Sequence, residues 1–141
     1  WYGDHLPTLG DNFTPYTSTG TIHADKAAEW TDEEKYTMFC TPYVMFANYD
    51  TGNDYRAEDQ QVSPYLLPAL LCDYINAPAC LQTNFLLHVY ETCPVMSPYY
   101  NLYTPGTTAE EHEELQKLHR YLTYDELIGE KYLDKMQGFE F

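Results

Sequence analysis

The feature that most constrains this 141-residue sequence is one run of apolar residues, Tyr43 to Tyr49, which directly follows Pro42. The run is nearly continuous rather than alternating, so it predicts a β-strand buried on both faces, as in the sheet of an α/β protein. The polar residues 50–54 (Asp-Thr-Gly-Asn-Asp) then predict a turn. A single buried strand cannot satisfy its own backbone hydrogen bonds. Neighbouring strands are therefore expected elsewhere in this chain, in a second copy paired edge to edge as a homodimer, or in sequence outside the chain.

Several stretches carry the end signals and the spacing of helices. Thr31 and Glu34 have the form of a capping box and predict a short helix to about Met38. Ser63-Pro64 is typical of a helix start, but Pro68 lies inside the leucine-rich stretch that follows, so that helix either begins near Pro68 or bends there. Further helices are expected over residues 81–91 and from Thr107 or Thr108 onward, with another helical or turn segment over 124–133.

The resulting fold class is α/β, rich in helix, with one or a few strands. Residues 1–24 and 94–107 are predicted to be loops because they are rich in Gly, Pro and Thr or Tyr. The chain thus divides into a loop (1–24), a short helix with the buried strand and a loop (25–61), and a helical C-terminal region (62–141).

The charge and the cysteines narrow the classes of partner. The net charge is −15, from 22 acidic and 7 basic residues, so a nucleic acid or an anionic lipid surface would be repelled. The cysteines, at positions 40, 72, 80 and 93, match no structural zinc spacing. In an oxidising compartment Cys72 and Cys80 could form a disulfide, and in a reducing one all four are expected to be small buried hydrophobic residues.

The strongest candidate for a chemical site is the adjacent pair Asp4-His5. A carboxylate oxygen and an imidazole nitrogen are suitable ligands for Mn²⁺ or Zn²⁺. In a regular strand neighbouring side chains point to opposite faces. Gly3 and Pro7 flank the pair and allow the chain to leave strand geometry, so both side chains can reach one ion. Most Asp-His pairs in loops bind no metal, so the pair alone is weak evidence for a metal site and needs support from other features of the sequence.

Other ionisable residues give weaker indications. His112 and His119 lie seven residues apart on one helix face among glutamates, which a solvated face explains, and His88 is expected in the core of its helix. His23 has no partner that the sequence identifies. An acidic stretch could form a Ca²⁺ loop, but it lacks the EF-hand order of ligands and the closing Glu, so a plain acidic loop is the favoured interpretation. That stretch comprises Asp50, Asn53, Asp54, Glu58 and Asp59.

Four blocks along the chain, in order, carry a family resemblance. They are residues 1–10 (WYGDHLPTLG), 41–50 (TPYVMFANYD), the leucine-rich 65–75, and 121–132 (YLTYDELIGEKY). Together they resemble the C-terminal end of the lipoteichoic acid synthase and sulfatase-like family of Gram-positive bacteria, within the alkaline phosphatase superfamily. The resemblance covers nearly the whole chain.

The resemblance implies the C-terminal portion of an alkaline-phosphatase-like (sulfatase) fold and a divalent metal. The metal is commonly Mn²⁺, with Zn²⁺, Mg²⁺ or Ca²⁺ as alternatives, and it is held by a Glu, a nucleophilic Thr and the Asp-His pair. Only Asp4 and His5 match that set, so no catalytic residue is expected in this chain. The nucleophile, the substrate-binding residues and the membrane helices are expected in an upstream part of the same protein, as the start at Trp1 also indicates.

The expected activity of the intact protein is that of a sulfatase-like hydrolase or phosphoglycerol transferase. It would act on lipid phosphodiesters or on sulfate or phosphate esters at the extracellular face of the cell membrane, and the 141 residues alone are expected to have no turnover. The alternative is a non-catalytic module that binds the cell envelope or a partner protein. The 15 tyrosines fit that alternative, because Tyr packs well against sugars and protein surfaces, although an ordinary core rim explains them too.

Overall fold

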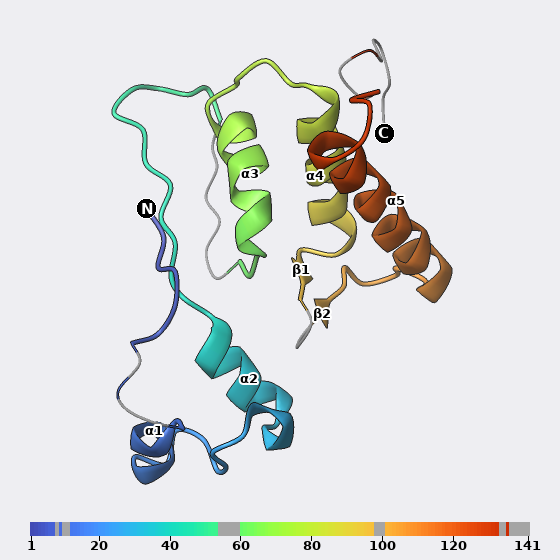
Figure 1. The fold of residues 1–141 in the computed structure, drawn as a ribbon. Helices are drawn as coiled ribbons and strands as arrows, with labels where there is room; N and C mark the ends of the chain where they lie inside the picture. Colours follow the sequence, from blue (N-terminus) through green and yellow to red (C-terminus); the bar gives the residue numbers. More distant parts are fainter. Residues whose placement is uncertain (8, 10–11, 54–59, 98–100, 133–134, 136–141) are drawn as a thin grey trace. The chain divides into compact units, whose positions relative to one another are not determined.

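The structure, a computed structural model, describes residues 1–7, 9, 12–53, 60–97, 101–132 and 135. The chain divides into two compact units, unit 1 from Trp1 to Phe46 and unit 2 from Ala47 to Phe141. Both contain helices, and unit 2 also has a two-stranded antiparallel sheet (Figure 1). The chain is therefore a helix-rich mixed α/β protein. Among the described residues, no helix combines the length and the apolar character needed to cross a bilayer.

Unit 1 contains two short α-helices and one 3₁₀ turn. They are α1 (Thr14–Ser18), η1 (Ala27–Glu29) and α2 (Asp32–Phe39). The capping box predicted for α2 is present, because Thr31 Oγ1 accepts from the Glu34 backbone N–H at 3.2 Å and the Glu34 carboxylate accepts from the Thr31 N–H at 2.8 Å. Helix α1, in contrast, lies inside the segment predicted to be a loop.

The core of unit 1 is small. Ile22, Trp30 and Met38 are buried, and partly buried residues including Leu6 and Tyr16 pack against them. Trp30 is the largest of the three and is only 3% exposed. Its indole N–H donates to the Ala24 carbonyl oxygen at 2.7 Å, so the polar edge of the ring is satisfied inside the core.

The two ends of unit 1 lie side by side in antiparallel extended conformation. The Gly3 N–H donates to Pro42 O at 3.0 Å, the Val44 N–H donates to Trp1 O at 2.7 Å, and Tyr2 and Tyr43 form an isolated bridge. Gly3 allows a close approach of the two segments, since a Cβ there would lie 3.0 Å from the Thr41 Cβ, and Thr41 would have to shift by a few tenths of an ångström.

The prediction of a buried strand over residues 43–49 is wrong for the described chain. Beyond the bridge at Tyr43 the segment is not assigned to a strand. Val44 is 55% exposed and Phe46 is 82% exposed. An apolar run favours burial, but burial on two faces requires neighbouring strands and covering layers. Among its described residues, unit 1 provides only the short pairing with residues 1–3.

Unit 2 is built on helices α3 (Leu67–Tyr74), α4 (Leu81–Thr92) and α5 (Ala109–Leu127). The 3₁₀ turn η2 (Pro64–Leu66) leads into α3, which places Pro68 in the first turn of that helix. The missing N–H of Pro68 therefore breaks no intrahelical bond, because first-turn N–H groups have no helical acceptor. Of the two alternatives for this helix, a start near Pro68 is confirmed.

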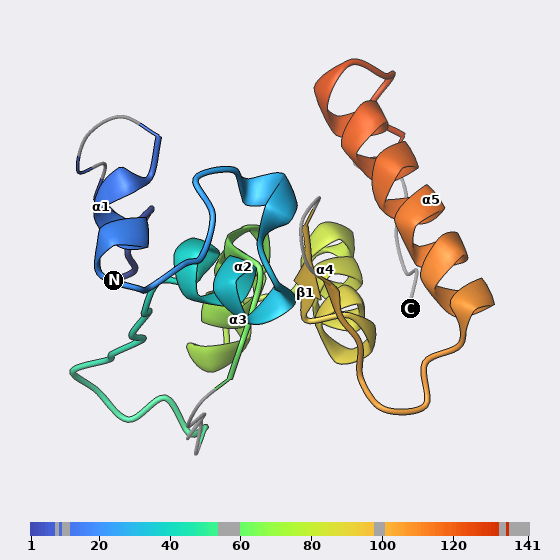
Figure 2. The same ribbon diagram turned by 90° about the horizontal axis from the view of Figure 1, so that it is seen from below.

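Helix α4 lies between α3 and α5 and contacts both of them (Figures 1 and 2). The main buried cluster of unit 2 joins η2, α4 and α5, and its members are Leu66, Phe85, Val89, Cys93 and Leu115. On α3, Ala69 and Leu70 are buried. The prediction for α5 is confirmed, because Thr108 and Glu111 form its capping box. This helix continues without a break to Leu127. It therefore includes the first part of the segment 124–133, which was expected to be a separate helical or turn segment.

A short hairpin lies between α4 and α5, within the segment predicted to be a loop. Its strands are β1 (Val95–Met96) and β2 (Asn101–Leu102), with Val95 opposite Leu102. The buried Ser63 fixes the hairpin, since its Oγ accepts from the Met96 N–H at 2.9 Å and donates to the Met96 carbonyl at 3.1 Å. Ser63 thus serves the hairpin instead of capping a helix with its side chain.

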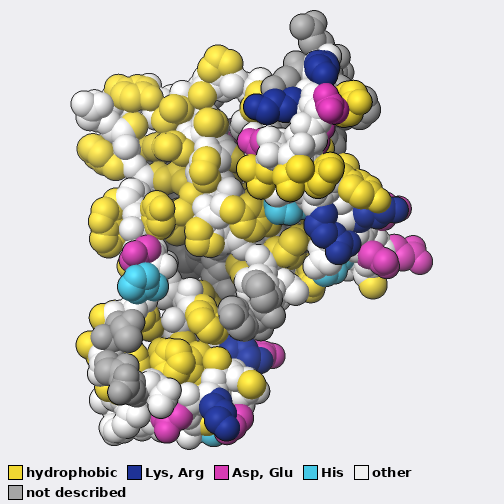
Figure 3. Space-filling model, viewed as in Figure 1, with side chains coloured by type: hydrophobic (Ala, Val, Ile, Leu, Met, Phe, Trp, Pro, Cys, Tyr) yellow, Lys and Arg dark blue, Asp and Glu magenta, His cyan; other side chains and the backbone are white. Residues whose placement is uncertain are grey.

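The exposed surface of unit 2 differs between its helices. On the face drawn in Figure 3, hydrophobic side chains cover much of the area around α3, whereas charged side chains gather over α5. Leu71 and Ile75, at the C-terminal end of α3, are 44% and 36% exposed.

Candidate functional site

Asp4 and His5 follow the extended segment at the start of unit 1, and their side chains converge. The Asp4 carboxylate is 81% exposed and the His5 imidazole 71% exposed. The His5 backbone N–H donates to Asp4 Oδ1 at 2.9 Å. The His5 Nδ1 lies 2.8 Å from the Leu6 carbonyl oxygen, and Nε2 lies 3.4 Å from Asp4 Oδ2. Residues 3–7 are not in a strand, so neighbouring side chains can approach one another.

This geometry fits two ligands of one metal ion. Two donor atoms about 2.1 Å from a tetrahedral ion such as Zn²⁺ lie about 3.4 Å apart, which matches the separation of Asp4 Oδ2 and His5 Nε2. Around an octahedral ion such as Mn²⁺ they lie about 3.0 Å apart, so the two side chains would move closer by about 0.4 Å. A hydrogen bond from Nδ1–H to a backbone carbonyl is the usual way in which a metal-binding histidine is oriented, because it leaves the Nε2 lone pair for the ion. Within the ranges that the structure describes, no group of three or more His, Cys, Asp or Glu side chains is placed to hold a metal. Asp4 and His5 could therefore supply two ligands of a metal ion, and the ion would need further donor atoms from elsewhere.

The backbone around the pair is held in place by the neighbouring segment. Gly3 donates its N–H to Pro42, and its carbonyl accepts from Thr41 Oγ1 at 2.6 Å. The residue that precedes Asp4 thus has both of its backbone groups bound. This arrangement fixes the direction in which Asp4 and His5 leave the extended segment.

An apolar pocket of about 400 Å³ lies beside His5 within unit 1. The His5 ring forms part of its wall. The other described lining residues are mainly apolar and comprise Leu6, Pro7, Leu9, Asn12, Phe13, Pro15 and Tyr16 together with Met38 and Phe39 of α2. Sequence reasoning missed this pocket, because it forms where segments far apart in the sequence meet.

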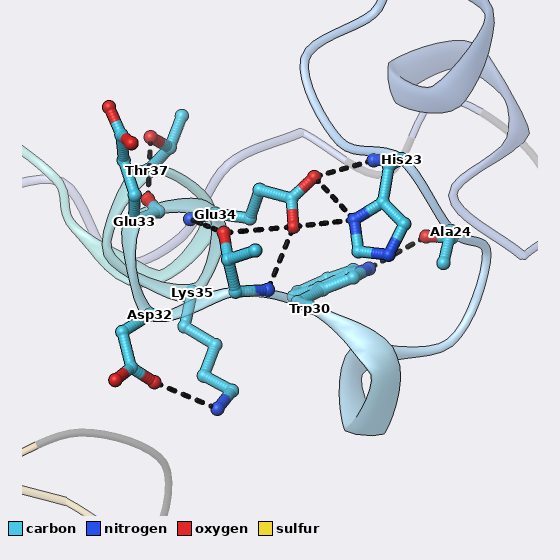
Figure 4. Close-up of polar contacts among 9 residues, drawn as sticks. His23, Ala24, Trp30, Asp32, Glu33, Glu34, Lys35 and Thr37 are labelled. Carbon is cyan, nitrogen blue, oxygen red and sulfur yellow. Dashed lines mark hydrogen bonds and ion pairs between the residues drawn. The ribbon is translucent and has the colours of Figure 1, made fainter.

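A second cluster of polar groups surrounds Glu34, at the start of α2 (Figure 4). The His23 Nδ1 lies 2.9 and 2.8 Å from the two Glu34 carboxylate oxygens, and the His23 backbone N–H donates to the same carboxylate at 2.6 Å. The Thr31 N–H and hydroxyl donate to it as well. One carboxylate therefore ties the loop at His23 to the start of α2.

These hydrogen bonds stabilise the charged form of Glu34. Together they lower the pKa of Glu34 from 4.5 to about 2, and the hydrogen bond from the Thr31 N–H is the largest cause. Partial desolvation raises the pKa, but the bonds from His23 and from the Thr31 hydroxyl lower it further. His23, which had no partner identified from the sequence, is thus the partner of a residue that was identified as a helix cap. The sequence indicated that Glu34 belongs to a capping box, but it did not indicate that the same carboxylate also binds His23.

We expect the stability of unit 1 to fall as the pH drops from about 4.5 to about 2, in part through Glu34. A carboxyl group with a lowered pKa in the folded state stabilises fully above its unfolded pKa, and the contribution is lost as the pH falls through the folded value. Glu34→Gln removes this component. Urea unfolding monitored at pH 7, 4 and 2.5 measures it. Glu33→Gln, at a neighbouring position on α2, is the matched control; equal pH profiles of the two variants would contradict the role of Glu34.

The other histidines are placed differently from the expectations. His88 is exposed and not in the core, because it lies at the edge of the helix face that Phe85 and Val89 define. His119 packs against the rings of Tyr65 and Phe85, with centroids 5.2 and 6.1 Å away, and its burial lowers the pKa of the imidazole.

His112 also has specific partners and is half-buried, so it is not on a solvated face. Its Nε2 lies 3.0 Å from the Tyr103 hydroxyl and 3.0 Å from Gln116 Nε2. The contact with Tyr103 joins α5 to the segment after β2.

The acidic stretch after residue 49 is a polar turn as far as it is described. Asp50 Oδ1 accepts from the Gly52 N–H at 2.9 Å, and Asn53 Nδ2 donates to the Asp73 carbonyl at 2.7 Å. The first bond closes the turn, and the second ties it to the end of α3. The remaining candidates for a Ca²⁺ loop, Asp54, Glu58 and Asp59, lie outside the described residues.

All four cysteines are free thiols. The Cys72–Cys80 disulfide is therefore not formed. The alternative of four buried thiols holds only for Cys93, because Cys40 and Cys80 are exposed and Cys72 is half-buried. The Cys80 sulfur lies 3.5 Å from the Thr83 backbone nitrogen, so it takes the N-cap position of α4.

Comparison with known proteins gives no match to a family model, to a curated protein or to a solved structure.

Proposed function

We propose that this chain is the C-terminal part of a metal-dependent sulfatase-like hydrolase or phosphoglycerol transferase. In this proposal Asp4 and His5 are two ligands of a divalent cation, with Mn²⁺ as the first candidate. The observation that carries the proposal is the 3.4 Å separation of Asp4 Oδ2 and His5 Nε2, with His5 Nδ1 held by the Leu6 carbonyl. Both side chains are exposed and so are accessible to an ion.

The pairing at the ends of unit 1 supports the proposal. Residues 1–10 and 41–50 are two of the blocks that resemble the sulfatase-like family, and residues 1–3 are hydrogen-bonded to residues 41–44. Blocks about forty residues apart that resemble one family and also contact each other are more specific than either block alone. The other two blocks lie in unit 2, over α3 and at the end of α5.

The chemical role of the pair is to hold and orient the cation. A bound divalent ion lowers the pKa of a coordinated hydroxyl and neutralises charge on a transferring phosphoryl or sulfuryl oxygen. Asp4 contributes a negative charge that favours a cation over an anion at this point of the loop. His5 contributes a neutral nitrogen whose ring orientation is fixed. The nucleophile and the remaining ligands belong, in this proposal, to the upstream part of the same domain, at the extracellular face of the membrane.

The experiment is a Mn²⁺ titration of the full-length protein, together with turnover of a phosphodiester and a sulfate ester. We expect Asp4→Asn and His5→Gln each to weaken Mn²⁺ affinity by about 100-fold or more, because even outer-shell partners are worth about 10-fold to 100-fold. Turnover is expected to fall with metal occupancy.

The matched control is Asp32→Asn. The Asp32 carboxylate is 79% exposed, close to the 81% of Asp4, but it pairs with Lys35 and lies away from the loop. We expect this variant to bind Mn²⁺ like the unchanged protein. Full metal affinity and full turnover in both Asp4→Asn and His5→Gln would remove the proposed mechanism.

A further inference from the structure

Helix α5 has two apolar faces, and unit 2 uses one of them for its own core. On that face Leu115 is buried, and Leu118 and Leu122 pack against the same cluster. Nearer the C-terminal end of the helix, Gln82 Nε2 donates to the Glu126 carboxylate at 2.6 Å, which also ties α5 to α4. These contacts fix the rotation of α5 about its own axis, and so decide which of its side chains point away from the core.

The second apolar face lies on the side of α5 opposite these leucines, and it is exposed. Tyr121, Tyr124, Leu127 and Ile128 recur at the spacing of one helix face, and we call them the tyrosine stripe. The Ile128 N–H donates to the Tyr124 carbonyl at 2.9 Å, so the helical path reaches the last of them. The two tyrosines are each 60% exposed, Leu127 is 74% exposed and Ile128 is 73% exposed. Within unit 2, α5 lies on the outer side of α4, with the stripe turned away from the core (Figure 2).

The exposed area of the tyrosine stripe is sufficient for a small interface. A fully covered aromatic side chain buries about 150–250 Å², and the whole stripe therefore offers on the order of 400 Å² at its exposed fractions. Two copies that cover each other's stripe bury on the order of 800 Å², and the aliphatic stems of Lys117 and Arg120 beside it add to this area. An interface of this size is at the lower end for specific complexes. It predicts a weak, reversible dimer that dissociates on dilution.

The charges along α5 differ between its two halves. Residues 109–116 contain four glutamates and no basic residue. Residues 117–132, which include the tyrosine stripe, contain three basic and three acidic residues, so they are neutral in a chain whose net charge is −15. A second copy of the chain therefore meets less electrostatic repulsion at the stripe than at the acidic half of the helix.

An antiparallel arrangement of two α5 helices also brings unlike charges together. When two stripes face each other in this way, the exposed Glu113 and Glu114 of one copy lie toward the C-terminal end of the other helix, where Lys131 is exposed. A parallel pair would instead place the glutamates of one copy beside those of the other. The antiparallel pair has a two-fold axis and is self-complementary, as in most homodimers. A nucleic acid or an anionic lipid surface would meet the same glutamates and be repelled.

We propose that the tyrosine stripe is a homodimer interface, at which the α5 helices of two copies of this chain pack antiparallel. The inference goes beyond the proposed function, because it concerns the assembly of unit 2 and uses neither Asp4 nor His5. It also differs from the edge-to-edge pairing of strands expected from the sequence, since the contact is made between helices.

The first test is sedimentation velocity of the full-length protein over a series of concentrations, which we expect to show a monomer–dimer equilibrium. Tyr121→Glu places a carboxylate in the stripe and is expected to raise the dissociation constant of the dimer at least about tenfold. Tyr49→Glu is the matched control, because Tyr49 is 57% exposed and belongs to the same unit but lies outside α5. Far-ultraviolet circular dichroism checks that both variants keep their helices. A monomer at every concentration, or equal dissociation constants for the two variants, would overturn the inference.

The second test uses charge reversal to show that the partner is another copy. One variant carries Glu113→Lys and Glu114→Lys, and the other carries Lys131→Glu. Each variant alone is expected to dimerise about threefold to tenfold more weakly, because its own two ends then carry like charges. An equal mixture of the two is expected to form a heterodimer at least as tight as the unchanged homodimer, since both contacts again join unlike charges. Unweakened homodimers of the variants, or a mixture no tighter than its components, would overturn the antiparallel pairing.

Discussion

Phe85→Ala is expected to lower the free energy of unfolding of unit 2 by about 3–5 kcal/mol, the usual range for truncating a buried aromatic residue. Phe85 is 1% exposed and lies at the centre of the unit 2 core, where it also stacks on His119. A loss of this size is a large part of the whole stability of a domain, which is about 5–15 kcal/mol. Urea unfolding followed by far-ultraviolet circular dichroism, which reports α3, α4 and α5, measures it.

The matched control for Phe85 is another aromatic residue on a helix of the same unit. Tyr124, on α5, is 60% exposed, and Tyr124→Ala is expected to change the unfolding free energy by no more than about 0.5 kcal/mol. A loss below about 1 kcal/mol in Phe85→Ala would contradict the central position of this residue in the core.

The features that the sequence predicted best are those decided by neighbours in the chain. The capping boxes at Thr31 and Thr108 require only a glutamate three residues later, so both could be located from the sequence. The start of α3 was also predictable, because Pro68 is compatible with a first turn and with little else in a helix.

The features that were missed depend on residues far apart. The apolar content of residues 43–49 is compatible with burial, but only the surroundings decide it, and Phe46 is in fact largely exposed. His23 and Glu34 lie eleven residues apart, at a spacing that no local pattern marks. The left-handed pair Asn12-Phe13 has no glycine to indicate it.

The candidate site was predictable in part for the same reason. Asp4 and His5 are adjacent, and Gly3 and Pro7 indicated irregular backbone, so their convergence could be anticipated. The pocket could not be, because its walls come from the start of the chain and from the end of α2. Phe13 and Phe39 of its lining pack on Trp30, a residue that no motif marks.

Trp30→Ala is expected to have the largest effect in unit 1, with a loss of about 3–5 kcal/mol in the free energy of unfolding. The change removes the largest side chain of a core with only three buried hydrophobic members among the described residues. It also removes the indole on which the Phe13 and Phe39 rings pack. Urea unfolding followed by near-ultraviolet circular dichroism measures the loss of stability.

Two further variants divide the contribution of Trp30 into its parts. Trp30→Phe keeps an aromatic ring but loses the bond to the Ala24 carbonyl, which is expected to cost about 0.5–1.5 kcal/mol from that bond, with further loss from the smaller ring. Trp1→Ala is the control, because the chain has two tryptophans and the Trp1 side chain is 80% exposed. If Trp30→Ala were as stable as Trp1→Ala, unit 1 would not depend on this core. The pocket walls would then need another support, because Phe13 and Phe39 both pack on the Trp30 indole.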